Sequence, residues 1–444
     1  MLNDNSDAKQ RSLESIEAQR VTNDVAKYCV DGVEPQIGVS PISVDEIVTV
    51  VKTASEESLG IVPFGGGTRI CLGNPLSGSY GIALNMRSMN RIVTHNAGDL
   101  TATVESGITL KELSDVLYDH GQFLALDAPL LSKATIGGTL AAGAIGPLKW
   151  QFGSPRDLVV GMQVVQSHGK LVKSGGRVVK NVSGYDMARL HIGGLGSLGV
   201  ITEVSFKLSP LPQVQKNLVI TFKQLEHSIS SGLDIANTEI MPLSMMSFDR
   251  TVNHTAGLGL STSEGYLAIR LGGRPRTLNR QLQECIKICE NYEAVEFLEL
   301  DEQATYTFWR LLVDYKWESE VENPIARISV APDQIYPMIK NMLVQDKPDF
   351  LSFLTEPGYG SMIVHWSDEG YDDFEEAVII SMEKSRDMAV NLGGHFIIER
   401  APENIKSNLD PWGKVGGSIE IMRRMKQEYD PANIFNVGRF VGGI

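Results

Sequence analysis

The sequence reads Gly175-Gly176-Arg177-Val178-Val179-Lys180-Asn181-Val182-Ser183-Gly184-Tyr185-Asp186 and, three residues later, Leu190-His191-Ile192-Gly193-Gly194-Leu195-Gly196-Ser197-Leu198-Gly199-Val200-Ile201-Thr202. Glycine is dense here, yet the apolar spacing is that of strands and a helix start. Because glycine costs backbone entropy inside regular elements, such a cluster indicates left-handed dihedrals or a close approach of the backbone to another group.

Two more glycine-rich segments lie upstream, Val62-Pro63-Phe64-Gly65-Gly66-Gly67-Thr68 and Ala134-Thr135-Ile136-Gly137-Gly138-Thr139. Three such segments in one half of the chain favour one large ligand that is contacted along its length, and three unrelated tight turns are the alternative. The first loop lacks the Gly-Lys-Ser/Thr of a nucleotide-triphosphate P-loop, and it does not match the dinucleotide fingerprint. We expect its backbone N–H groups to face an anion.

Composition excludes several classes of protein. Hydrophobic residues make up 42% of the 444 residues, and no apolar run approaches the ~20 residues of a membrane-spanning helix. The polar N-terminus does not resemble a signal peptide, so we expect a cytoplasmic protein that reaches a membrane only through partner subunits. With 40 basic and 54 acidic residues the net charge is −14, and without a basic cluster nucleic-acid binding is not expected.

The first half alternates strand and helix, which favours an α/β arrangement with a ligand at a strand end. Ser43-Val44-Asp45-Glu46 predicts a capping box and a following helix. The proline pair in Ser209-Pro210-Leu211-Pro212 marks the clearest domain boundary. Predicted strands in this half span residues 36–39, 61–63, 81–85, 91–94, 101–105, 158–165, 170–173 and 200–208.

The second half, from Leu218 to about Arg400, predicts an α+β domain whose sheet is covered on one face. Its predicted strands span residues 218–222, 266–271, 326–330, 362–366 and 395–399, and its predicted helices span 276–290, 332–343 and 373–388. We therefore divide the chain into an N-terminal segment that is helical or poorly ordered (1–32), a ligand-binding domain (33–212), a cap domain (213–412) and a C-terminal segment (413–444) that returns to the first domain.

Several of these motifs together resemble flavoproteins of the vanillyl-alcohol oxidase / p-cresol methylhydroxylase type. They are Pro63 to Thr68, Thr135 to Gly138, Arg156-Asp157, Val179 to Asp186 and Gly199 to Thr202, in that order. With Gly143 to Pro147 and Asp430 to Arg439 added, the sequence is similar to the FAD-binding subunits of glycolate oxidases (glycolate dehydrogenases). The resemblance begins near Val33, is specific in the first domain and is weaker in the second.

The resemblance implies an α+β fold, in which a two-subdomain FAD-binding domain of the p-cresol methylhydroxylase type is covered by a cap domain over the flavin. It implies one FAD per chain, with the pyrophosphate at Gly65 to Thr68 and Thr135 to Gly138, and the adenine near Ile201. The cofactor-binding residues it implies are Pro63, Gly65, Gly66, Gly67, Thr68, Leu72, Gly73, Thr135, Gly137, Gly138, Lys180, Asn181, Gly184, Ile201, Asn436 and Arg439.

Some members of this family attach FAD covalently through a His in the first glycine loop. This chain has Thr68 and Arg69 there, and no Cys near residues 134–153. We therefore expect FAD to be bound without a covalent bond.

Oxidation of a 2-hydroxy acid at a flavin needs a cation for the carboxylate, a base for the hydroxyl proton, and the α-carbon near flavin N5. Arginine suits the carboxylate because its guanidinium binds it in a bidentate way. Arg310, Arg400 and Arg439 are the candidates, although each is more often a surface or ion-pair residue. His365 and His395 are candidate bases, although a strand histidine is more often structural.

The chain departs from the family in one respect. Catalytic 2-hydroxy-acid dehydrogenases of this kind commonly carry a His-Pro-Gly-Asp-Gly-Asn-x-His run linked with metal and substrate binding, and this chain has none, so we expect no metal site. Cys29, Cys71, Cys285 and Cys289 are too scattered to ligate an iron–sulfur cluster.

Three hypotheses follow. The first is a glycolate or D-lactate dehydrogenase subunit that works with a second flavin subunit and an iron–sulfur subunit. The second is a stand-alone FAD oxidase of another hydroxy acid or alcohol. The third is a non-catalytic FAD-binding scaffold.

Overall fold

The structure is a computed structural model that describes residues 20–176, 185–318, 323–346, 350–368 and 373–444. The chain forms two compact units. The first unit contains the residues up to Ile145, Ser154–Pro210 and Lys414–Ile444, and the second contains Gly146–Gly153 and Leu211–Gly413. No helix among the described residues has the length and apolar character needed to cross a lipid bilayer.

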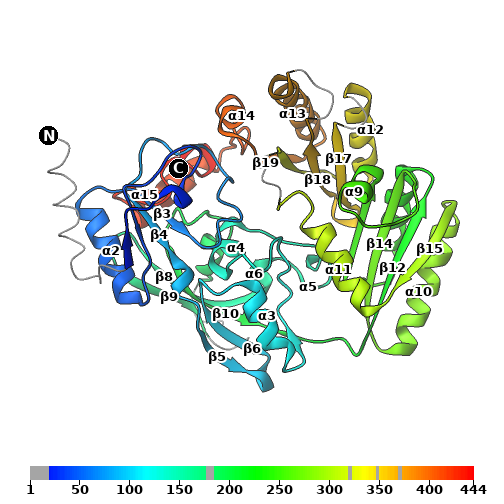
Figure 1. The fold of residues 1–444 in the computed structure, drawn as a ribbon, viewed down its shortest axis with the longest axis horizontal. Helices are drawn as coiled ribbons and strands as arrows, with labels where there is room; N and C mark the ends of the chain where they lie inside the picture. Colours follow the sequence, from blue (N-terminus) through cyan, green and yellow to red (C-terminus); the bar gives the residue numbers. More distant parts are fainter. Residues whose placement is uncertain (1–19, 177–184, 319–322, 347–349, 369–372) are drawn as a thin grey trace. The chain divides into compact units, whose positions relative to one another are not determined.

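The first unit begins with a small sheet in the order β1-β2-β4-β3, of which β3 and β4 are labelled in Figure 1. Strands β2, β4 and β3 run parallel, and β1 pairs with β2 in the antiparallel direction. The strands are β1 (Val21–Thr22), β2 (Ile37–Val39), β3 (Ile61–Phe64) and β4 (Ile82–Asn85). Helix α2 (Val44–Glu56) connects β2 to β3 and buries Ile47, Val50, Val51 and Ala54 on one face, as its apolar spacing predicts.

The N-terminus of α2 has half of the predicted capping box. The Ser43 hydroxyl accepts the Glu46 N–H at 3.3 Å, as expected. The Glu46 carboxylate, however, accepts the Ile42 N–H at 2.9 Å and forms an ion pair with Arg20, so the reciprocal bond to Ser43 was a wrong prediction. An arginine from outside the helix offers the carboxylate a charge-assisted bond, which is stronger than one to a neutral N–H.

The second sheet of this unit has five antiparallel strands in the order β5-β6-β10-β8-β9. They are β5 (Ile92–Asn96), β6 (Thr101–Glu105), β8 (Val159–Val165), β9 (Leu171–Gly175) and β10 (Val200–Lys207), and all five lie where strands are predicted. A short pair joins β7 (Gln122–Phe123) to β11 (Ser209–Pro210). The helices of this part are α3 (Leu110–Tyr118), α4 (Ile136–Ala142), α6 (Pro155–Leu158) and α7 (Ala188–His191).

The second unit is built on an eight-stranded antiparallel sheet in the order β15-β12-β14-β13-β17-β18-β16-β19. Its strands are β12 (Val214–Phe222), β13 (Ser244–Asp249), β14 (Gly265–Gly273), β15 (Ala294–Leu300), β16 (Ile325–Ser329), β17 (Leu351–Glu356), β18 (Ser361–Trp366) and β19 (His395–Arg400). Its helices are α5 (Lys149–Phe152), α8 (Leu225–Ala236), α9 (Arg250–Thr255), α10 (Pro275–Glu290), α11 (Glu302–Val313), α12 (Ile335–Gln345), α13 (Phe374–Asn391) and α14 (Glu403–Asn408).

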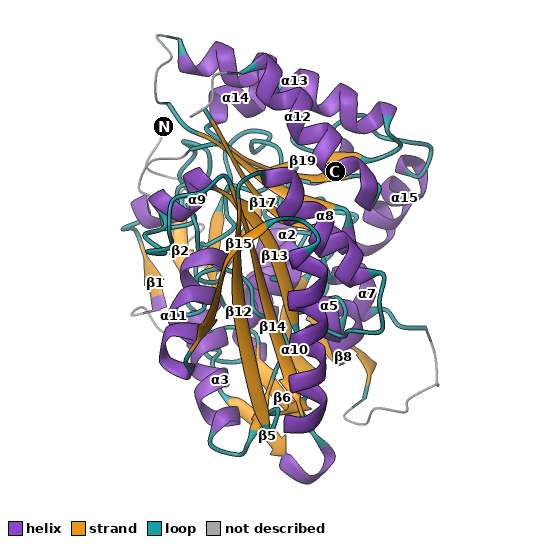
Figure 2. Cartoon of the chain, turned by 90° about the vertical axis from the view of Figure 1, so that its right-hand side faces the viewer, coloured by secondary structure: helices purple, strands orange, loops and turns teal. Residues whose placement is uncertain are grey.

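Helices cover parts of both faces of this sheet, so the prediction of a single covered face was wrong. Figure 2 shows α10 along β12 and β14, where it packs with α8 against Leu218 and Ile220. Helices α12 and α13 continue this layer over β16, β17 and β18. On the opposite face α9 and α11 pack against Val219 and Phe248, because alternate residues of these strands are apolar too.

Beyond α11 the second face of the sheet is polar. Arg327 of β16 pairs with Glu399 of β19 at 2.6 Å and donates to the Ser361 hydroxyl at 3.3 Å. Lys149 of α5 pairs with Glu356 at the end of β17 at 2.5 Å. Each of these charges is largely buried and meets an opposite charge, as buried charges must.

The C-terminal segment extends the small parallel sheet of the first unit. Helix α15 (Ile419–Tyr429) ends at Asp430, and the chain then runs beside β3. The Ile61 N–H donates to Ile434 O at 2.6 Å, and the Asn436 N–H donates to Ile61 O at 3.0 Å. Residues 434–436 therefore form a single parallel bridge to the edge of the sheet, next to the glycine loop.

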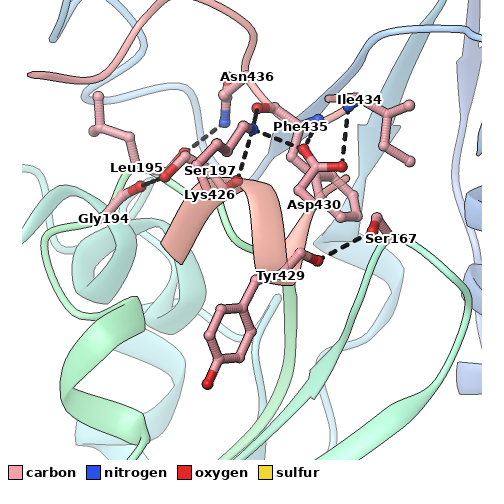
Figure 3. Close-up of polar contacts among 10 residues, drawn as sticks. All are labelled: Ser167, Gly194, Leu195, Ser197, Lys426, Tyr429, Asp430, Ile434, Phe435 and Asn436. Carbon is pink, nitrogen blue, oxygen red and sulfur yellow. Dashed lines mark hydrogen bonds and ion pairs between the residues drawn. The ribbon is translucent and has the colours of Figure 1, made fainter. Parts of the chain in front are cut away.

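A buried lysine fixes this segment in place (Figure 3). Lys426 Nζ pairs with the Asp430 carboxylate at 2.7 Å and donates to the Ser197 and Phe435 carbonyls, each at 2.9 Å. The same carboxylate accepts the Ile434 and Phe435 N–H groups. Burial lowers the pKa of Lys426, and the Asp430 charge opposes that shift. The ion pair thus joins the helix end, the turn after it and the 194–197 loop.

We expect Lys426→Met to destabilise the protein by about 3–5 kcal/mol, because it leaves the Asp430 charge buried without its cation. The matched control is Lys111→Met, which breaks an exposed pair of the same i,i+4 spacing with Asp115 and is expected to cost at most about 1 kcal/mol. The midpoints of urea unfolding measure both changes. Equal midpoints for the two variants would contradict this role of Lys426.

Candidate functional site

The loop after β3 offers a row of unused hydrogen-bond donors. No backbone N–H from Gly65 to Thr68 donates to any residue in the part of the chain that the structure describes. Gly67 has a φ of +71°, and a side chain built there would meet nothing within 4 Å. Consecutive N–H groups that face open space form a concave site for an anion.

The glycines of this loop are also required by packing. A methyl group on Gly65 would lie 2.0 Å from Thr135 Oγ1, and one on Gly66 would lie 1.7 Å from Lys133 O. The first two glycine-rich segments of the sequence are therefore in direct contact. This contact brings the β3 loop against the N-terminus of α4.

Two cavities of the first unit meet at this contact. One lies between the β3 loop, α4 and the C-terminal segment, and the other runs from the same loop towards the start of β10. They share lining residues that include Pro63, Gly65, Thr135, Gly138 and Leu195. Of the predicted cofactor residues, the first cavity is lined by Pro63, Gly65, Gly66, Gly67, Thr68, Thr135, Gly138, Asn436 and Arg439, and Gly137 and Ile201 line the second.

The N-terminus of α4 contributes empty space to these cavities but few free hydrogen-bond donors, because its first backbone N–H groups already donate within the protein. The Ile136 N–H donates to Ile108 O at 2.9 Å and the Gly137 N–H to Ser106 O at 2.7 Å. The Gly138 N–H donates to the Thr135 hydroxyl, the N-cap of the helix, at 3.3 Å. Gly138 has only Thr135 Oγ1 near the position of a Cβ, at 3.1 Å, so its missing side chain leaves cavity space.

Asn436 and Arg439 form the wall of the cavity from the C-terminal side. Asn436, with a φ of +45°, donates from its amide to Leu195 O and accepts from Arg439 Nη1 at 3.1 Å. Arg439 Nη2 donates to the carbonyls of Ile70 and Leu72, and burial lowers the pKa of its guanidinium.

Leu72 and Gly73, by contrast, support Arg439 and do not line either cavity. The Leu72 carbonyl accepts from Arg439 Nη2 at 2.9 Å, and a Cβ on Gly73 would lie 2.5 Å from Arg439 O. Three further predicted cofactor residues, Lys180, Asn181 and Gly184, lie outside the described residues.

Sequence reasoning missed several residues of the cavity walls. Ser106 lines the second cavity, and its buried hydroxyl has no hydrogen-bond partner among the described residues, which suits a ligand atom. Leu195 lines both cavities with a φ of +50°, and it lies inside the glycine-rich stretch that drew attention first. Ser106 gives no such signal, because a serine after a strand is common.

Two of the four predicted catalytic residues lie on the two strands that flank β16. His365 of β18 and Arg400 of β19 both pair with Ile325 of β16. Burial lowers the pKa of His365 to about 3, with Arg400 and Lys316 adding to the shift, so its imidazole is neutral at pH 7. Arg400 donates to Asn323 O at 3.1 Å and to Lys316 O at 2.7 Å.

The other two lie apart from this pair. His395 is exposed at the start of β19 and pairs with Ser329, at the opposite end of β16 from Ile325. Arg310 of α11 forms an i,i+4 ion pair with Asp314 at 2.5 Å. The second unit therefore brings together His365 and Arg400 but not His395 or Arg310.

Comparison with known proteins identifies the first unit's cofactor. Residues 35–175 match the FAD binding domain family FAD_binding_4. The glycolate oxidase subunit GlcD of Bacillus subtilis is 28% identical over 424 residues, which cover 91% of this chain and 88% of that protein. The D-lactate dehydrogenase of Archaeoglobus fulgidus is 25% identical, with 91% and 90% covered. The glycolate oxidase subunit GlcE of Escherichia coli is 34% identical over 195 residues, with 44% and 53% covered.

Solved structures give the same fold. The crystal structure of p-cresol methylhydroxylase with substrate bound superimposes with a TM-score of 0.79 at 16% sequence identity, covering 98% of this chain and 96% of that one. The predicted fold is thereby confirmed, and so is FAD as the cofactor, through the matched domain. The unused N–H donors after β3, the Ser106 hydroxyl and the space at Gly138 fit a long ligand that carries a pyrophosphate.

We expect Gly138→Leu to lower the FAD content of the purified protein several-fold, because the new side chain occupies the space next to the β3 loop. Gly98→Leu is the control, since Gly98 lies in the same unit with nothing within 4 Å of its Cβ position, away from both cavities. Flavin absorbance per chain measures both variants. Full FAD content in Gly138→Leu would refute the placement of the cofactor in these cavities.

Proposed function

We propose that this protein is the FAD-dependent subunit of a 2-hydroxy-acid dehydrogenase that oxidises glycolate or D-lactate. The observation that carries this proposal is the row of unpartnered N–H groups at Gly65 to Thr68, set in a domain that matches the FAD binding family. The similarity to a glycolate oxidase subunit and to D-lactate dehydrogenases covers about nine-tenths of the chain, the second unit included, and supports the substrate class.

A bound FAD, held by the β3 loop, α4 and the C-terminal segment, would supply the hydride acceptor for this oxidation. The residues of the chain have to hold the substrate carboxylate and take the hydroxyl proton. His365 is neutral at pH 7 and so offers an acceptor nitrogen for the second task, but a pKa of about 3 makes its imidazole a weak base. The guanidinium groups of Arg310 and Arg400 are already engaged, one with Asp314 and the other with backbone carbonyls.

We propose that electrons leave the flavin through partner subunits. Cys285 and Cys289 are buried in the hydrophobic core under α10, and burial raises the pKa of each thiol to about 12. Among the described residues no group of three or more His, Cys, Asp or Glu side chains is placed to hold a metal. An iron–sulfur subunit and a second flavin subunit would complete such a complex in the cytoplasm.

We also propose that FAD is held without a covalent bond. The described residues that line the two cavities include no His, Cys or Tyr, the side chains that usually attach a flavin. Precipitating the protein with acid should therefore release the yellow flavin into the supernatant. A yellow pellet would show a covalent bond instead.

Mixing the purified protein with glycolate or D-lactate without oxygen should bleach its flavin, because hydride transfer reduces the isoalloxazine. L-lactate is the control for stereochemistry, and a panel of other hydroxy acids and alcohols extends the test. Bleaching by members of that panel alone would indicate a stand-alone oxidase of another substrate. Bleaching by none of them, with or without partner subunits, would refute catalysis and leave a binding scaffold.

A further inference from the structure

The second unit contains a cavity of about 620 Å³ that the FAD site does not use. Its lining comes from three separate segments of the chain. These are α9 with the loop that follows it, the Tyr315–Lys316 segment after α11, and the strand ends around Ser352 and His365. A volume of this size is typical of sites for small organic ligands.

The charged side chains that line this cavity are cationic, although the protein as a whole has a net charge of −14. They are Lys316 and Arg250, and Arg250 forms an ion pair with Glu264 at 3.3 Å. His254 and His365 also line the cavity, and the imidazole of His365 is neutral at pH 7. The described lining residues include no Asp or Glu, so the ammonium of Lys316 favours an anionic ligand.

His365 gives the cavity an unused polar group. The residue is 1% exposed, and the Tyr315 backbone lies near its imidazole and raises its pKa slightly. Neither ring nitrogen makes a hydrogen bond of normal geometry in the part of the chain that the structure describes. Its ring lies edge-on to Tyr315, 4.8 Å between centroids, and the Tyr315 hydroxyl bonds to Ser352 at 3.1 Å rather than to the imidazole. A buried donor and acceptor without partners costs free energy, so a ligand that satisfies both gains affinity.

Lys316 is held in position by a strained backbone. Its φ is +62°, a left-handed conformation that is uncommon for lysine. Arg400 Nη2 donates to the Lys316 carbonyl at 2.7 Å, and Arg400 Nε donates to Asn323 O at 3.1 Å, so the Lys316 backbone is tied to β19. Such strain is found at sites where a side chain must point in one direction.

We propose that this cavity binds a small organic carboxylate, with Lys316 supplying the positive charge and His365 a donor and an acceptor for an α-hydroxyl. The choice of a 2-hydroxy acid rests on the proposed function. The acceptor nitrogen of the imidazole matches the hydroxyl O–H, and the N–H of the ring matches an oxygen of the ligand.

The test uses the FAD-loaded full chain and 2-hydroxyisobutyrate as the probe. This compound has the carboxylate and the α-hydroxyl of lactate but no α-hydrogen, so it binds without being oxidised. Isothermal titration calorimetry gives Kd for the wild-type protein, for Lys316→Met and for His365→Phe. We expect at least a tenfold weaker Kd in each variant, since each loses a charge-assisted or buried hydrogen bond.

The control is Lys340→Met, which removes an exposed lysine of α12 outside the cavity, and its Kd should equal that of the wild type. His365→Phe keeps a ring and removes two unpartnered nitrogens, so its melting temperature should match or exceed the wild-type value. A structural histidine would give the opposite pair of results, with a lower melting temperature and unchanged binding.

An unchanged Kd in either cavity variant would overturn the proposal, and so would binding of inorganic phosphate but not of 2-hydroxyisobutyrate. This failure is separable from failure of the proposed function. If D-lactate bleaches the flavin equally in all three proteins, the enzyme activity stands and the cavity is not its site. If the probe binds as predicted but no hydroxy acid bleaches the flavin, the cavity assignment stands and the activity falls.

Discussion

The ion pair between Lys426 and Asp430 is the contact on which the first unit depends. Both groups are buried, and the ammonium and carboxylate together make five hydrogen bonds that tie the end of α15 to the residues beside β3. A single buried charge without a partner would destabilise the fold. The ion pair is stable because the ammonium and the carboxylate are hydrogen-bonded to each other and to backbone groups around them. Through this contact Asn436 and Arg439 reach the cofactor cavity from the far end of the sequence.

A second constraint is the space between the two glycine-rich segments. The β3 loop lies so close to Lys133 and Thr135 that no side chain fits at Gly65 or Gly66. The segments thus approach each other backbone to backbone, and the donors of the loop stay directed at open space. Packing and ligand binding require the same glycines, for different physical reasons.

Local patterns in the sequence predicted most elements of the fold, because alternation and apolar spacing report burial directly. Strands β13 and β17 were missed, since Ser244–Asp249 and Leu351–Glu356 both mix polar with apolar residues and are buried throughout. Strand β15 was missed because it is an edge strand and largely exposed. At the candidate site the glycine motifs predicted the loop after β3. Ser106 lines the second cavity only because the fold brings it there, and no local pattern in the sequence predicts this. The backbone contacts of Arg400 are likewise invisible in a one-dimensional pattern, whereas the i,i+4 spacing of Arg310 and Asp314 is present in the sequence.

The first unit is discontinuous in sequence, since Lys414–Ile444 completes a structure that begins near residue 20. A ribosome has to synthesise the whole second unit before Asn436 and Arg439 exist. The wall of the flavin cavity is therefore completed only after the second unit has been synthesised. A chain that is cut between the second unit and Asn436 lacks this wall, even though every glycine-rich segment is present.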